Sequence, residues 1–177
     1  MTPKVFRQQS EIRYGNLASR FFALYTPDDP ESQKQSLRDR GMSSMYLWAL
    51  RSKTTMHAPI YTYYFSEPTP WPEHPEFAAF HTSEIPYDFG NLDKGEHPYS
   101  DVDRRISRQM VGYWTNFFRT GNPNGGQLPP WPAVRTGTAA TMEIGPKTEA
   151  RPLMGQEKLA FWADYFNSPV SKDTPYR

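Results

Sequence analysis

The sequence predicts an α/β fold in which helices cover a small, mostly parallel sheet. Three observations support this prediction. Residues 59–65 are almost continuously β-branched and aromatic, which is typical of a strand covered on both faces. Residues 101–119 carry apolar side chains at helical spacing. Helical and strand patterns also alternate along the chain, in the order helix, helix, strand, short strand, helix, strand, helix.

Two helices are expected before the first strand. The first spans residues 10–25, with Ser10 as its N-cap candidate, and the second spans residues 31–52. The second helix is expected to bury one apolar face. Leu37, Gly41, Met45 (or Ser44) and Trp48 fall on that face, and Met42, Tyr46 and Leu50 widen it. Its glycine is expected to permit close packing.

A proline-rich loop, Ser66 to Pro75, follows the strand at residues 59–65. Residues 77–80 form a short apolar run that predicts another inner strand, and this strand would stop at His81.

The helix at residues 101–119 has the clearest end signals. Ser100 and Asp103 are spaced as in a capping box, and Gly121 is placed as a C-cap glycine. Residues 139–144 predict a short edge-like strand, and residues 156–166 predict a last helix. The polar tail after Asn167 is expected to fray.

The composition restricts the possible classes of function. The 20 basic and 19 acidic residues give a net charge of +1, so neither nucleic-acid nor anionic-membrane binding is predicted. The densest basic stretch, Arg104, Arg105 and Arg108, is interpreted as a solvated helix face. No cysteine is present, which excludes disulfides and thiolate metal sites. No signal peptide or spanning segment is visible, and the compartment stays open.

Aromatic side chains make up 15% of the residues, whereas the hydrophobic fraction is only 37%. This balance suits a piece that packs against a larger body.

The four histidines differ in their surroundings. His57, His74 and His97 are interpreted as surface or structural residues, because none has a partner at metal-ligand spacing. No metal or cofactor site is predicted. His81 would lie at the carboxyl end of a strand, where catalytic residues of α/β sheets collect. The residues alone leave two interpretations of His81, a general base or a satisfied structural histidine.

Residues 80–92 read FHTSEIPYDFGNL and resemble the segment around the catalytic histidine of type-B carboxylesterases. Residues 110–117, MVGYWTNF, and 120–124, TGNPN, resemble the next landmarks of that family, and Trp131-Pro132 fits its following Trp-Pro. The resemblance extends from about residue 14 to residue 166. It implies the C-terminal part of an α/β-hydrolase fold, comprising the last sheet strands with flanking helices.

The resemblance further implies that His81 is the general base of a serine carboxylesterase that hydrolyses small-molecule carboxylic esters without a cofactor or metal. Glu84 matches the acidic residue three positions after the histidine. It is expected to support the histidine loop through a charge-assisted hydrogen bond, and not to serve as the triad acid.

The other parts of the catalytic apparatus are missing from residues 1–177. No G-x-S-x-G elbow occurs, and the nearest candidate, residues 41–45, lies in a predicted helix. An H-G-G-G oxyanion loop is also missing, and the family's acid would fall before Met1. Residues 1–177 are therefore expected to form the C-terminal segment of a carboxylesterase domain, inactive by itself.

Two other interpretations stay open. The chain could be a non-catalytic, cholinesterase-like binding module, or it could fold only as an oligomer that pairs its sheet edge and aromatic faces. The expected partner is therefore a missing N-terminal portion or a second copy. The sequence does not specify the acyl or alcohol preference of the intact enzyme.

Overall fold

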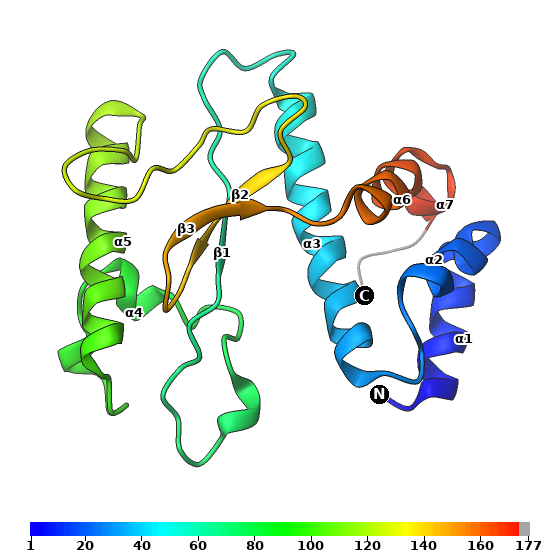
Figure 1. The fold of residues 1–177 in the computed structure, drawn as a ribbon, viewed down its shortest axis with the longest axis horizontal. Coiled ribbons are helices and arrows are strands. Elements are labelled where there is room, and N and C mark those ends of the chain that lie inside the picture. The colour runs from blue at the N-terminus through cyan, green and yellow to red at the C-terminus, as the bar shows by residue number, and fades with distance from the viewer. Residues whose placement is uncertain (174–177) are drawn as a thin grey trace. The chain divides into compact units, whose positions relative to one another are not determined.

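The computed structural model describes residues 1–173, except for the side chains of residues 172 and 173. The chain divides into two compact units (Figure 1). The discontinuous unit combines residues 1–52 with the segment that begins at Leu153, and the continuous unit comprises residues 53–152.

The discontinuous unit is helical. Its elements are α1 (Pro3–Tyr14), the 3-10 helix η1 (Gly15–Leu17), α2 (Ala18–Leu24), α3 (Pro30–Ser52), α6 (Gln156–Asn167) and α7 (Val170–Asp173). The first helix begins earlier than predicted, because Thr2 is the N-cap and Pro3 supplies a preset first turn. Ser10 is therefore buried inside α1 and is not an N-cap. Gly15, at φ +51°, ends α1, so the single predicted helix is two.

Aromatic rings form the core of this unit. Tyr14 of α1 stacks on Phe21 of α2 at 4.2 Å between ring centroids and meets Tyr165 of α6 edge-on at 5.1 Å. Phe21, Phe161 and Trp162 are fully buried. The prediction of α6 is confirmed. Because α7 occupies part of the tail, fraying just after Asn167 is not observed, and the tail from residue 174 lies outside the described residues.

Helix α3 occurs where it was predicted, but of the predicted apolar face only Tyr46 is buried. Leu37, Met45 and Trp48 are each more than half exposed, and a β-carbon at Gly41 would meet nothing within 4 Å. The buried face is largely polar. It consists of Gln33, Ser36, Asp39, Ser43, Tyr46 and Ala49.

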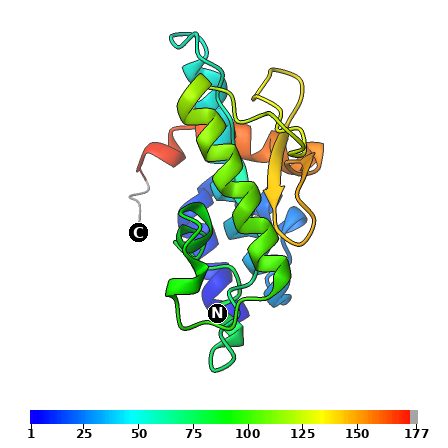
Figure 2. The same ribbon diagram turned by 90° about the vertical axis from the view of Figure 1, so that its left-hand side faces the viewer.

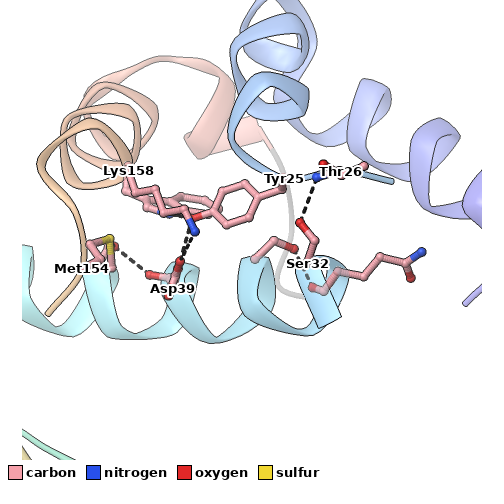
Figure 3. Close-up of polar contacts among 10 residues, drawn as sticks. Tyr25, Thr26, Ser32, Asp39, Met154 and Lys158 are labelled. Atoms are coloured by element: carbon pink, nitrogen blue, oxygen red, sulfur yellow. Dashed lines mark hydrogen bonds and ion pairs between the residues drawn. The ribbon is translucent and has the colours of Figure 1, made fainter. Parts of the chain in front are cut away.

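Hydrogen bonds explain why a polar face is buried (Figure 3). Asp39 accepts the Tyr25 hydroxyl at 2.9 Å, and Lys158 of α6 approaches the same carboxylate oxygen at 3.6 Å. The indole of Trp162 donates to the Tyr25 hydroxyl at 2.9 Å. Ser43 Oγ donates to the Asp39 carbonyl at 2.6 Å. These buried polar groups on α3 and its neighbours are thereby partnered, which offsets the penalty for burying them.

The continuous unit holds a three-stranded mixed sheet with helices beside it. Its elements are β1 (Tyr63–Phe65), η2 (Pro75–Phe77), α4 (Ile85–Asp88), η3 (Leu92–Lys94), α5 (Asp101–Thr120), β2 (Ala140–Ile144) and β3 (Glu149–Pro152). β1 pairs in parallel with β2, with Tyr63 opposite Met142, and β2 pairs antiparallel with β3. β2 is thus the central strand, not an edge, because it is followed by the unpredicted strand β3.

β1 is shorter than the strand predicted at residues 59–65. The residues just before β1 nevertheless form hydrogen bonds within the continuous unit. The Ile60 carbonyl accepts from Val134 N at 2.8 Å, and the Thr62 carbonyl accepts the Trp131 indole at 3.0 Å. Residues 60–65 are half-buried, not covered on both faces.

Helix α5, the long helix nearest the viewer in Figure 2, packs its apolar stripe on the sheet. Ile106, Met110 and Tyr113 are buried against Met142 and Ile144 of β2. The predicted capping box and C-cap are both confirmed, with the cap glycine in the left-handed region at φ +72°. None of the helices described in residues 1–173 is long and apolar enough to cross a bilayer.

Candidate active site

Helix α4, which follows the histidine segment, is fixed to α5 by hydrogen bonds. The buried Tyr87 hydroxyl donates to Asp103 Oδ1 at 2.6 Å, and Ser107 Oγ donates to the Tyr87 carbonyl at 2.9 Å. The indole of Trp114 donates to Asp88 Oδ1. Three bonds from three turns of α5 therefore set the position of α4, and with it the position of the loop just before it.

His81 lies at the corner of a tight turn. Ser83 N donates to the Phe80 carbonyl at 3.0 Å, which closes a β-turn over residues 80–83. Thr82, its third residue, has φ +76°, whereas the φ of His81 is negative. Only a type II turn combines these signs, and it normally places glycine third. A β-branched residue in this conformation is an outlier and marks a constrained loop.

The side chain of His81 is exposed, and it makes no hydrogen bond or ion pair with the residues that the structure describes. A neutral imidazole in this state has a ring nitrogen free to accept a proton. The hydroxyl of Ser83, two residues on, is buried and has no hydrogen-bond partner within residues 1–173.

The expectation that His81 ends an inner strand is wrong, because residues 77–80 form no strand. Ala78 has φ +47°, which a strand cannot contain. Phe77 and Phe80 both contact the ring of Trp71, at 5.5 and 6.5 Å between centroids. Residues three apart on a strand point to opposite faces, so this shared contact requires a folded segment.

The rings before His81 form an aromatic cluster that sequence reasoning did not anticipate. Trp71 meets His74 at 5.0 Å and His97 at 5.1 Å, and His74 stacks on Phe77 at 4.9 Å. Phe77 and Phe80 remain 46% and 39% exposed, so the cluster presents apolar rings at the surface beside the histidine. The sequence signal that could have predicted this cluster is the high density of aromatic residues in and just after the proline-rich loop.

Glu84 is half-buried, and its carbonyl accepts from Tyr87 N at 2.9 Å and Asp88 N at 3.0 Å as the N-cap residue of α4. Within the described residues its carboxylate makes no hydrogen bond to His81. The support of the histidine loop by Glu84 therefore stays a prediction, and so does the role of His81.

Two ionisable side chains near Glu84, those of Asp88 and Tyr63, have raised pKa values. Burial raises the pKa of Asp88, and the charge of Glu84 raises it further, although the indole bond opposes both. Burial raises the pKa of Tyr63 to about 12, with contributions from Asp88 and Glu84.

Other candidate chemistry is not assembled in the described part of the chain. Ser43, in the segment nearest to an elbow motif, lies inside α3, so it is not at a strand-to-helix turn. No three His, Asp or Glu side chains of residues 1–173 gather as metal ligands. His57 is exposed, and the carboxylate of Glu76 lies 3.2 Å from His74 Nδ1.

The arrangement resembles known proteins in sequence and in structure. The model of the family described as "Carboxylesterase family" matches residues 9–162. Carboxylesterase 4A of Bos taurus is 39% identical over 84 residues, which are 48% of this chain and 15% of the relative. Bile salt-activated lipase of Homo sapiens is 32% identical over 141 residues, which are 71% of this chain and 19% of the relative.

A solved thermophilic PNB esterase has a TM-score of 0.67 and 26% identity, covering 90% of this chain and 33% of that protein. A second PNB esterase structure has a TM-score of 0.64 at 25% identity, with 92% of this chain covered and again 33% of the other. The chain therefore spans about a third of these structures and less of the curated relatives. These matches confirm a partial α/β-hydrolase fold.

Proposed function

The chain belongs to the type-B carboxylesterase family, and from that premise we propose that it supplies the catalytic-histidine portion of a serine carboxylesterase. His81 takes the proton from the serine hydroxyl during attack on the ester carbonyl and returns it to the leaving alcohol. The substrate class is small-molecule carboxylic esters. The nucleophile and the triad acid come from polypeptide other than residues 1–177.

The observation that carries this proposal is the unengaged, exposed imidazole of His81 on a well-anchored support. A general base must be free to reach its nucleophile, and it must be held rigidly enough to meet it in one geometry. A buried structural histidine would instead have its ring nitrogens occupied by protein groups. We assign Glu84 to support the loop, because it is the N-cap residue of α4 and joins this helix to the turn that contains His81.

A second candidate function is a binding or oligomerisation module. The apolar face of α3 favours it, since Leu37, Met45 and Trp48 are 58%, 56% and 52% exposed. Exposed apolar side chains at helical spacing suit contact with another protein surface. In the first proposal that surface is the missing portion of the esterase, and in the second it is another copy or another protein.

The esterase proposal is tested with a 4-nitrophenyl ester and two polypeptides. Residues 1–177 alone should give no turnover above buffer. The same residues within a longer polypeptide that carries a G-x-S-x-G segment and an upstream acid should be active. His81→Ala should then lower kcat by about 10⁴-fold or more, while His57→Ala, a change at another exposed histidine, should leave kcat unchanged.

Two results would overturn the proposal. The first is full activity of the longer polypeptide carrying His81→Ala. The second is robust turnover by residues 1–177 that His81→Ala abolishes, because the chain would then hold its own nucleophile. Because His81 is exposed and makes no hydrogen bond or ion pair in the described structure, its replacement should change the free energy of unfolding by less than about 0.5 kcal/mol. A change in activity would therefore not report misfolding.

Sedimentation of the chain tests the second candidate. Concentration-dependent association that Trp48→Glu removes would favour the module. A monomer at high concentration would count against self-association.

A further inference from the structure

The continuous unit contains a hollow of about 510 Å³ between α5 and the segment that follows α4. This volume lies in the range of small-molecule sites. Phe89, Leu92 and Val111 contribute apolar surface to it, and Arg104 and Arg108 contribute guanidinium groups. The hollow is thus amphiphilic, with an apolar lining and a cationic wall.

Both walls of the hollow are held in place before any ligand arrives. Gly90, at φ +63°, carries the backbone so close to α5 that a β-carbon there would lie 3.1 Å from Val111 Cγ2. Ser107, also part of the lining, is bonded to the carbonyl of Tyr87. A preformed site loses little conformational entropy on binding.

The charge of the hollow is available to a ligand. Arg104 and Arg108 lie one helical turn apart, so their side chains are neighbours on the surface of α5. Arg104 donates to the Tyr99 carbonyl at 3.4 Å, a bond that uses only one of its five donors. Arg108 makes no hydrogen bond or ion pair with residues 1–173. Asp93, the acid of the lining, is 3.2 Å from Lys94 Nζ.

We propose that this hollow binds a small carboxylate with an apolar or aromatic body. The guanidinium of Arg108 takes the carboxylate, for which its planar fork is suited. The ring of Phe89, 76% exposed, and the side chains of Leu92 and Val111 cover the body of the ligand. Carboxylates of this kind are also what the proposed ester hydrolysis releases. The binding itself does not require that reaction.

The test is isothermal titration of residues 1–177 with 4-phenylbutyrate, 4-phenylbutanol and acetate. The first probe has both features of the ligand, the second lacks the charge, and the third lacks the body. 4-Phenylbutyrate should bind saturably and more tightly than either other probe. Arg108→Ala should lower the affinity for 4-phenylbutyrate about tenfold, because it removes one charge-assisted hydrogen bond.

Arg105→Ala is the matched control. Arg105 lies on α5 between the lining residues Arg104 and Ser107, but its guanidinium donates to the Pro146 carbonyl at 2.6 Å and does not line the hollow. The Arg105→Ala substitution should leave the affinity for 4-phenylbutyrate unchanged. Phe89→Ala should weaken the two phenyl probes and leave acetate as it was. Circular dichroism should show all three variants folded.

The proposal fails if 4-phenylbutyrate does not saturate, if 4-phenylbutanol binds equally well, or if Arg108→Ala has no more effect than Arg105→Ala. No ester is present in these titrations. If the titrations show no binding, the proposed role of His81 is unaffected. If instead the esterase proposal is wrong, the affinity measured for 4-phenylbutyrate remains valid.

Discussion

Replacing Thr82 with glycine should stabilise the continuous unit. The left-handed region costs an ordinary L-residue roughly 1–2 kcal/mol, and β-branching makes the residue a clear outlier there. Glycine avoids this cost but loses more backbone entropy on folding, by roughly 0.5–1 kcal/mol. The hydroxyl of Thr82 forms no hydrogen bond in the described structure, so its removal forfeits none. The net gain for Thr82→Gly is about 0.5–1 kcal/mol.

Urea unfolding followed by tryptophan fluorescence measures this gain. Two controls separate conformation from side-chain loss. Thr82→Val keeps the shape and the strain, so its midpoint should match that of the unaltered chain. Thr136→Gly removes an exposed threonine whose φ is negative, and it should destabilise by roughly 0.5–1 kcal/mol. If Thr82→Gly destabilises as much as Thr136→Gly, the strain argument is wrong.

Three further predictions concern the same unit. Ser100→Ala removes the N-cap of α5 and should cost about 1 kcal/mol in urea unfolding. Glu67→Gln should raise the free energy of unfolding at pH 7, because burial and the charge of Asp103 raise the pKa of Glu67 and disfavour its ionised form in the folded state. The gain should vanish in acid, where the carboxyl of Glu67 is protonated, and urea unfolding at the two pH values measures it. Tyr63 has a folded pKa of about 12 against 10 when unfolded, so the unfolded chain ionises first and stability falls as pH rises between these values. Tyr63→Phe should flatten that fall, seen as a smaller difference between urea midpoints at pH 9 and pH 11.5.

Local signals in the sequence were reliable where the local chain determines the structure. The ends of α5 followed from Ser100, Asp103 and Gly121, because caps satisfy backbone groups within a few residues of themselves. The family resemblance likewise predicted the partial α/β-hydrolase fold, since it rested on several ordered segments. Predictions that needed a partner surface were less successful.

Helix α3 shows the limit clearly. Apolar periodicity identified Leu37, Met45 and Trp48 as one face, but periodicity does not reveal what covers a face. The covered face is instead set by Asp39, whose partners Tyr25 and Lys158 lie on separate parts of the chain. A polar residue becomes buried when distant partners satisfy it, and a single sequence does not show such pairs.

The candidate site shows the same contrast between features that the sequence predicts and features that it does not. His81 and Glu84 were named from the sequence, and their chemical roles remain to be tested. The prediction of a strand before His81 was wrong, because Phe77 and Phe80 both pack on the ring of Trp71. The positive φ of Thr82 carried no signal at all, since the residue type argues against it.

The discontinuity of the helical unit has a consequence for biosynthesis. Phe21 and Tyr25 leave the ribosome before Phe161 and Trp162, which complete their core and follow only after residues 53–152 have been made. At typical elongation rates the delay between Tyr25 and Phe161 is roughly 7–27 s. During that interval the nascent aromatic helices have no final partner and are natural clients for a chaperone, while residues 53–152 already contain everything their own core requires.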